Sequence, residues 1–210
     1  MNDPKQIIQK GYDQIAETYL DWTRKTRLEE REKYSSYLLN NLPPGVHILE
    51  LGCGAGKPTT QHLAARFRVT GVDISGKQIQ LARKNVAGTR FIQSDMGKLN
   101  FPVNSFSGVC AFYVFNHFPR EELPAMLGKI AIWLQPGGLF VASFGIADEA
   151  EAFDENWHGA PTYWSSYAPE KTRELIESAG MEIVSAELET DKEFKLPVTF
   201  LWVVARKPTK

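Results

Sequence analysis

The chain has 210 residues, of which 43% are hydrophobic and 23% charged, and its formal net charge is -1. This composition is that of one globular domain, and it argues against a nucleic-acid or anionic-membrane partner. Two cysteines, Cys53 and Cys110, cannot build a disulfide framework. The N-terminus lacks the apolar core of a signal peptide, and no apolar run is long enough to span a bilayer. We therefore expect a cytoplasmic protein, a monomer or a homodimer.

Two helices are predicted at the start of the chain, roughly over Lys5 to Trp22 and Leu28 to Asn40. The first helix carries a stripe of residues at i, i+3, i+4 and i+7 spacing, namely Tyr12, Ile15, Ala16 and Tyr19. Trp22 lies beyond this stripe. Such a stripe either packs on the core or covers a ligand. Buried tyrosine hydroxyls need polar partners, so we expect residues 1–42 to form a helical lid.

An apolar run that ends in an acid and three alternating glycines covers residues 46–59, VHILELGCGAGKPT. The run follows a Pro-Pro-Gly breaker and is typical of a strand buried on both faces of a parallel sheet. Gly52, Gly54 and Gly56 remove Cβ atoms where the backbone must turn sharply and let a ligand approach. Pro58 suits the first position of a following helix.

The spacing of these glycines separates two kinds of cofactor. In the dinucleotide fingerprint GxGxxG the third glycine would fall at position 57, which is Lys57. Glu50, just before the turn, would repel a pyrophosphate but suits a cofactor with an ammonium or sulfonium charge.

The next strand, RVTGVD from Arg68 to Asp73, also ends in an acid. Asp73 lies about 20 residues after the first glycine, where a ribose-binding carboxylate belongs. Ser75 and Gln78 form a capping box that opens a helix. Two strand-and-helix units are therefore predicted in succession.

The remaining elements keep this alternation. A third strand, Thr89 to Ser94, leads to Asp95 and Met96. After it we expect the following elements: a strand over 108–113, a helix from Pro119 to Trp133, a strand over 139–144, an irregular segment, a helix from Pro169 ending at Gly180, and a strand pair over 181–188 and 198–205. The pattern indicates a doubly wound α/β fold.

Five motifs in this order resemble those of the class I S-adenosylmethionine-dependent methyltransferases, and they span nearly the whole chain. They are ExGxGxG from Glu50, VDIS from Val72, QSDM from Gln93, FSGVCAFYVFNH from Phe106 and LQPGGLFVAS from Leu134. The resemblance implies a Rossmann-like seven-stranded sheet in a three-layer α/β/α arrangement, with strand order 3-2-1-4-5-7-6 and strand 7 antiparallel. It also implies a single domain over 1–210, with a cofactor-binding core at 43–145, an acceptor-side loop at 146–168 and a C-terminal helix and strand pair at 169–210.

The resemblance also implies cofactor contacts. Glu50 and the glycine loop would hold the amino-acid end of S-adenosylmethionine, Asp73 the ribose hydroxyls, and Asp95 the adenine amino group, with Ile74 and Met96 on the faces of the adenine. The full set of expected cofactor residues is Tyr19, Glu50, Gly52, Cys53, Gly54, Gly56, Asp73, Ile74, Gln78, Ser94, Asp95, Met96 and Phe112.

The acceptor is expected beyond the carboxyl ends of the strands, over residues 112–117. The segment 153–167 is rich in aromatic residues, which favours a pocket wall over a cluster that merely anchors a loop. The expected acceptor-binding residues are Tyr12, Trp22, Tyr113, Asn116, His117, Trp157, His158, Tyr163 and Trp164.

Methyl transfer is an in-line displacement that needs alignment and exclusion of water, while a general base is optional. His117 and His158 are the two histidines suitably placed to act as one. Each has a structural alternative: His117 could bond a backbone carbonyl, and His158 could face solvent. No metal-ligand spacing is present, so no metal is expected.

Residues 111–117, AFYVFNH, lack the (D/N)PP(Y/F) motif of enzymes that methylate amide or exocyclic nitrogens in proteins and nucleic acids. We therefore expect transfer to an O, N or S atom of a small molecule. Two other functions stay open. One is a protein that binds S-adenosylmethionine without transferring its methyl group, and the other, disfavoured by the glycine spacing and Glu50, is a nicotinamide-dependent oxidoreductase.

Overall fold

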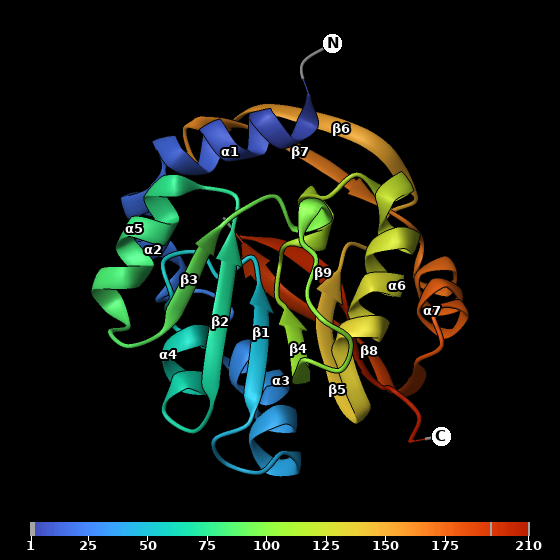
Figure 1. The fold of residues 1–210 in the computed structure, drawn as a ribbon. Coiled ribbons are helices and arrows are strands. Elements are labelled where there is room, and N and C mark those ends of the chain that lie inside the picture. The colour runs from blue at the N-terminus through green and yellow to red at the C-terminus, as the bar shows by residue number, and fades with distance from the viewer. Residues whose placement is uncertain (1–2, 194, 210) are drawn as a thin grey trace.

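The structure is a computed structural model that describes residues 3–193 and 195–209 (Figure 1). Its main sheet has seven strands in the order β3-β2-β1-β4-β5-β9-β8. The first five strands are parallel, and β9 is antiparallel to both of its neighbours, β5 and β8. The strands are β1 His47–Leu51, β2 Arg68–Asp73, β3 Arg90–Gln93, β4 Phe106–Ala111, β5 Leu134–Phe144, β8 Glu182–Glu193 and β9 Leu196–Arg206. This confirms the predicted order 3-2-1-4-5-7-6, because β8 and β9 are the sixth and seventh strands of this sheet.

Helices cover both faces of the sheet, as the three-layer prediction requires. One face packs against α3 Leu28–Asn41, α4 Thr59–Ala64 and α5 Gly76–Asn85, and the other against α6 Leu123–Trp133 and α7 Pro169–Ser178. Strand β1 shows why its sequence is apolar throughout: Ile48 packs toward α3, while Leu49 and Leu51 pack toward α6. The carboxyl end of β1 therefore emerges from a core that fixes its direction.

The N-terminal segment differs from the single helix expected over Lys5 to Trp22. It forms α1 Pro4–Gln14 and α2 Ala16–Thr23, with Ile15 between them at φ -100 and ψ 10. Ile15 is buried, so packing rather than local propensity sets the break. The tyrosine stripe survives it, because the rings of Tyr12 and Tyr19 still meet edge to face with centroids 5.0 Å apart.

The acceptor-side segment is a β-hairpin, not the irregular loop we expected over 146–168. Strands β6 Glu149–Trp157 and β7 Ala160–Ser166 form a separate two-stranded antiparallel sheet. Its two-residue turn has His158 at φ 53 and Gly159 at φ 93, the positive values that tight hairpin turns need. Figure 1 shows α1 and this hairpin lying together above the carboxyl ends of the sheet strands.

Helix α1 and the hairpin are in close contact. A Cβ added at Gly11 would lie 2.4 Å from the backbone oxygen of Pro161, so this position requires glycine.

Several other boundaries of helices and strands differ slightly from those predicted. Helix α4 begins at Thr59, just after Pro58; short 3-10 turns cover Met96–Lys98, Phe115–His117 and Arg120–Glu122; β5 begins at Leu134; and the closing strands reach Glu193 and start again at Leu196. Among the described residues, the helices are too short or too polar to cross a bilayer.

Candidate functional site

Two adjoining cavities lie at the carboxyl ends of β1, β2 and β4, beneath α1. They hold about 660 and about 410 Å³ of empty space and share several lining residues, so we treat them as one cofactor cavity. All but one of the thirteen expected cofactor residues line it. The exception is Gly56, which packs on α5, where an added Cβ would lie 3.3 Å from the Cα of Ala82. The structure thus corrects the expectation for Gly56.

The glycine loop is shaped by left-handed backbone conformations. Gly52 has φ +68 and Gly54 has φ +52, values that other residues adopt only with strain. A Cβ at Gly52 would lie 2.5 Å from Val114, whereas one at Gly54 would meet only Gln78 Oε1, at 3.8 Å. Gly54 therefore keeps space open in the cavity, while Gly52 is needed for packing.

Asp73, the last residue of β2, is held by two backbone N–H groups. The Gly54 amide donates to Oδ2 at 2.8 Å, and the Ser75 amide donates to Oδ1 at 2.9 Å. Burial raises the pKa of the Asp73 carboxyl to about 6, although these two hydrogen bonds act to lower it. Each oxygen keeps a free lone pair, so the carboxylate can still accept a hydrogen bond from a ligand hydroxyl.

Glu50 is buried near the end of β1. The Thr60 hydroxyl donates to Glu50 Oε2 at 2.6 Å. Burial raises the pKa of Glu50 to about 7, while the Thr60 bond and the positive charge of Arg31 act to lower it. A cation placed against Glu50 would favour the ionised form and lower this pKa further.

Asp95 follows β3 and lies at the far end of the cavity. Its Oδ1 accepts from the Gly97 amide at 2.8 Å, and its Oδ2 accepts from Lys5 Nζ at 3.0 Å. Lys5 also donates to Glu122 Oε2 at 2.6 Å. Because Lys5 lies on α1, the helix is tied to this end of the cavity.

The other end of α1 is tied as well. Asp13 Oδ1 accepts from the Ser75 hydroxyl at 2.6 Å and from the Lys77 amide at 3.0 Å. The Tyr12 hydroxyl lies 3.0 Å from His117 Nε2. Helix α1 therefore spans the cavity and is held on both sides of it, the geometry of a closed cover.

His117 is a buried residue that lines the cofactor cavity. Its Nδ1 lies 2.9 Å from the backbone oxygen of Tyr163, which can only accept, so Nδ1 carries the hydrogen. Nε2 then accepts from the Tyr12 hydroxyl. Burial lowers the pKa of His117 to about 4, so the ring is neutral at pH 7. The alternative that His117 bonds a backbone carbonyl is therefore confirmed, and the residue also lines the cavity, while its contact with a ligand stays a prediction.

A further small cavity, which we call the acceptor cavity, adjoins the cofactor cavity. The two share a wall made of Tyr19, Arg31, Tyr113 and His117. Among the residues expected to bind an acceptor, the following line this cavity: Trp22, Tyr113, Asn116, His117, Trp157 and Trp164. Tyr12 lines only the cofactor side.

Two expected acceptor residues, Tyr163 and His158, are absent from the described linings of these cavities. Alternation along β7 places Tyr163 on the face opposite Trp164. Its ring meets Phe153, and its hydroxyl donates to the Ala150 oxygen at 3.4 Å. His158 lies at the hairpin turn, with its ring 4.8 Å from that of Trp22. The irregular loop expected from the sequence gave no basis for the strand alternation that turns Tyr163 away from the cavity.

Arg31, which the sequence analysis missed, lines both cavities. Its guanidinium carbon lies 4.5 Å from the centre of the Tyr113 ring, and its Nη1 donates to the Thr59 hydroxyl at 3.4 Å. Its Nε is buried without a hydrogen-bond partner among the described residues. Arg31 belongs to a charge-rich helix, LEEREKY, where nothing local distinguishes it from a solvated arginine.

Tyr113 follows β4 in a left-handed conformation, with φ 58. Two contacts hold it there: its amide donates to the Ser143 hydroxyl at 2.7 Å, and its own hydroxyl donates to Glu30. A bulky residue with positive φ is uncommon and persists only where its surroundings fix it. Tyr113 is thereby held in place where the two cavities meet.

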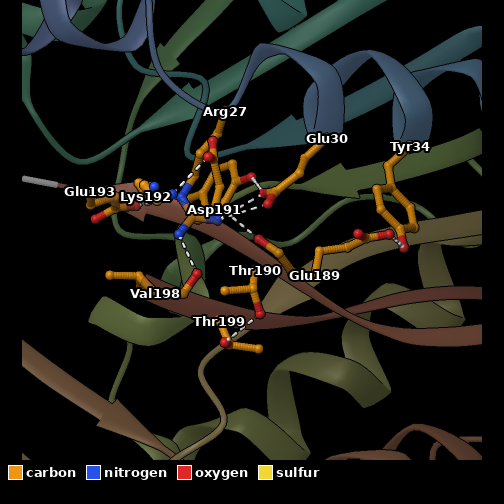
Figure 2. Close-up of polar contacts among 12 residues, drawn as sticks. Arg27, Glu30, Tyr34, Glu189, Thr190, Asp191, Lys192, Glu193, Val198 and Thr199 are labelled. Atoms are coloured by element: carbon orange, nitrogen blue, oxygen red, sulfur yellow. Dashed lines mark hydrogen bonds and ion pairs between the residues drawn. The ribbon is translucent and has the colours of Figure 1, made fainter. Parts of the chain in front are cut away.

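An ionic network forms the far wall of the acceptor cavity (Figure 2). Arg27 donates from Nη1 to both oxygens of Glu30, at 3.0 and 2.9 Å, and from Nε to Glu193 at 2.5 Å. Its Nη2 donates to the Val198 oxygen at 2.8 Å. Figure 2 shows Arg27 reaching from the helix toward the ends of the two closing strands. The network joins α3 to β8 and β9 and pairs one cation with two carboxylates, so its net charge is -1.

Methyltransferases are among the known proteins that resemble this chain. A family model described as a methyltransferase domain matches residues 48–138. A demethylmenaquinone methyltransferase from Symbiobacterium thermophilum is 27% identical over 179 residues, which cover 80% of this chain and 69% of that protein. A fatty-acid O-methyltransferase from Mycolicibacterium smegmatis and an O-methyltransferase from Pyrenophora dematioidea are also similar. The matched segments span only 44% and 61% of the lengths of these two proteins.

Solved structures share the fold over nearly the whole chain. Magnesium protoporphyrin IX methyltransferase from Synechocystis PCC 6803, solved with bound S-adenosylmethionine, has a TM-score of 0.73 and 18% identity and covers 99% of this chain and 98% of its own. A 1,6-didemethyltoxoflavin-N1-methyltransferase from Burkholderia thailandensis has a TM-score of 0.73 and 20% identity, with 99% and 92% covered. The family-model match and the methyltransferase relatives support a place in the class I S-adenosylmethionine-dependent methyltransferase family, and the solved structures show the same fold.

Proposed function

We propose that this protein binds S-adenosylmethionine in the cofactor cavity and transfers its methyl group to a small molecule held in the acceptor cavity. The observation that carries this proposal is the placing of three carboxyl groups along one cavity: Glu50, Asp73 and Asp95. Glu50 would hold the cofactor's ammonium group, Asp73 the ribose hydroxyls and Asp95 the adenine amino group. The relatives named above act on small molecules, which supports a small acceptor here.

Arg31 completes the cofactor site in this proposal. Its guanidinium lies on the cofactor side against Thr59, and its charge lowers the pKa of Glu50. The cofactor carries a carboxylate beside its ammonium group, and Arg31 is the cation placed to pair with it. The two ends of one amino-acid group would then be held by Glu50 and Arg31.

When bound, the cofactor supplies a methyl group whose bond to a positively charged sulfur breaks as a bond to the acceptor atom forms. The protein's part is alignment and exclusion of water. Tyr19 and Tyr113 line both cavities, so an acceptor beyond them faces the cofactor directly. Helix α1 and the β6–β7 hairpin cover this junction, so residues 1–42 would act as a lid and the hairpin as the acceptor-side wall.

His117 is a positioning residue in this scheme and not a general base. Its low pKa makes it a weak base, and its Nε2 lone pair is occupied by the Tyr12 hydroxyl. His158, at the hairpin turn, packs against Trp22 and is not among the described lining residues of the cavities. We therefore propose that the acceptor's proton leaves without a histidine base.

Replacement of Asp73 by Ala tests the cofactor assignment. Loss of a charge-assisted partner for the ribose should weaken binding of S-adenosylhomocysteine by about 1.5 to 3 kcal/mol, measured by calorimetry. Unchanged affinity would show that the ribose lies elsewhere. Transfer itself is tested by mass spectrometry for demethylated cofactor during incubation with a metabolite panel. A protein that binds the cofactor but yields none with any acceptor would contradict methyl transfer.

A further inference from the structure

The acceptor cavity is walled by aromatic rings set at right angles. The rings of Trp157 and Trp164 meet at 89° with centroids 5.4 Å apart, and those of Trp22 and Trp157 meet at 76° with centroids 6.5 Å apart. Rings in this arrangement form a corner that offers a face and an edge to one flat molecule, which aromatic pairs favour. A chain-like or bulky acceptor would leave these faces unused.

The charged side chains that line this cavity already have oppositely charged partners. Arg27 is paired with Glu30 and Glu193, as described above. Arg31 lines both cavities, and the proposed function assigns its charge to the carboxylate of the cofactor. With the cofactor bound, each charged side chain in the described wall of the acceptor cavity therefore already has an oppositely charged partner. A charged acceptor would lose its hydration there without gaining a partner.

Asn116 offers this cavity a polar atom that has no partner in the described part of the chain. It lies in the 3-10 turn Phe115–His117, lines the acceptor cavity and is only 6% exposed. Its Oδ1 is buried and has no hydrogen-bond partner among the described residues. A buried acceptor atom left without a donor is costly, and native proteins usually satisfy such an atom. A donor brought by a ligand would satisfy Asn116 Oδ1.

We propose, on the basis of the proposed function, that the acceptor is an uncharged, planar aromatic or heteroaromatic molecule with a hydroxyl or ring N–H group. That group donates to Asn116 Oδ1 while the ring lies in the corner formed by Trp157 and Trp164. Asn116 then fixes the orientation of the molecule, and the tryptophans fix its plane. Specificity arises because an analogue without the donor leaves the buried oxygen unpaired.

Calorimetry with three probes of one shape tests this inference. The probes are 2-naphthol, 2-methoxynaphthalene and 2-naphthoate, each added to the protein saturated with S-adenosylhomocysteine. We expect 2-naphthol to bind about tenfold more tightly than 2-methoxynaphthalene, which lacks the donor, and more tightly than the anionic 2-naphthoate. Tightest binding of 2-naphthoate would overturn the inference and indicate an anion site. Equal binding of naphthol and its ether, or binding of none of the probes, would also overturn it.

Variants separate the contribution of Asn116 from that of the fold. Asn116→Leu should bind 2-naphthol about tenfold more weakly and lose the preference over the ether, while Asn100→Leu, at an exposed asparagine, should match the parent. If Asn116→Leu does not fold, the comparison of probes on the unaltered protein still decides. Failure of S-adenosylhomocysteine to bind would contradict the proposed function. Normal S-adenosylhomocysteine binding without a probe preference would contradict only this inference.

Discussion

Lys5 Nζ and Asp95 Oδ2 lie 3.0 Å apart, although 90 positions separate the two residues in the chain. The same ammonium group reaches Glu122 at 2.6 Å, so α1 is bound to two segments at the end of the cavity assigned to adenine. The pair therefore joins the cover of the cavity to a residue expected to contact the cofactor. We therefore expect release of the cofactor to involve breaking this ion pair.

Replacing Lys5 by Met should accelerate cofactor release. Partly exposed ion pairs contribute about 0.2 to 1 kcal/mol each, so we expect the dissociation rate of S-adenosylhomocysteine to rise about threefold. Stopped-flow fluorescence measures this rate. Lys10→Met is the matched control, because Lys10 lies exposed on the same helix. Equal rates in the two variants would show that the ion pair does not hold the cover.

Glu50 makes cofactor binding depend on pH. In the free protein its pKa is raised to about 7 by burial, and a bound ammonium group would lower it. Binding should therefore release a proton near neutral pH, and affinity should rise as pH increases toward 7 and level off above it. Calorimetry in buffers of different ionisation enthalpy counts this proton. Glu50→Gln should bind more weakly and show a shallower profile below pH 7, because Asp73, with a pKa of about 6, still titrates there. A parental slope in that variant would exclude Glu50 as the source.

His117 should make folding stability depend on pH in the acid range. Its folded pKa of about 4 lies below its unfolded value of about 6.5, so the unfolded chain binds the extra proton between these values. The neutral His117 ring therefore contributes to the free energy of unfolding above pH 6.5. This contribution is lost as pH falls toward 4, by an amount on the order of 3 kcal/mol.

The raised pKa values of Glu50 and Asp73 act in the opposite direction over a similar range, because those folded carboxyl groups bind protons more readily than the unfolded ones. The measurement is therefore the difference in free energy of unfolding between the parent and His117→Gln, from urea titrations at pH 7 and pH 4. The difference should shrink at pH 4. Two curves that stay parallel would show that His117 titrates normally in the folded protein.

Trp157→Ala should impair turnover more than cofactor affinity. Trp157 lines the acceptor cavity and is absent from the described lining of the cofactor cavity. Loss of a large aromatic face should weaken acceptor binding by about 2 kcal/mol or more, while S-adenosylhomocysteine affinity changes by less than about threefold. Phe153→Ala, at an exposed aromatic residue of the same strand, is the control. Equal losses of turnover and cofactor affinity would indicate that the hairpin covers the cofactor instead.

The sheet and the glycine loop were predictable because their signals are local. Strand β1 is apolar on both faces and ends in Glu50, and Gly52 and Gly54 sit where the backbone is left-handed. The motif alone could not predict what Gly56 contacts. A motif shows that a glycine is needed but not whether ligand or protein occupies the space beside it, and at Gly56 that space belongs to α5.

The hairpin and the charged contacts could not be predicted in this way. Strand β6 is largely exposed on both faces, so its sequence lacks the alternation that marks a half-buried strand. Lys5 and Arg31 act through partners far along the chain or on another element, and nothing near them in sequence indicates those partners. Their roles follow from the closed arrangement of the helices, which only the three-dimensional structure shows.

The contact between Gly11 and the Pro161 backbone has a kinetic consequence. Because α1 rests on β7 without an intervening side chain, the helix cannot lift from the cofactor while it keeps its place on the hairpin. We therefore expect the exits of the two products to be coupled, with one opening event serving both. A substitution such as Gly11→Ala would push helix α1 away from β7. We expect the rate of product release to change as a result, although every residue assigned to cofactor or acceptor binding is unaltered.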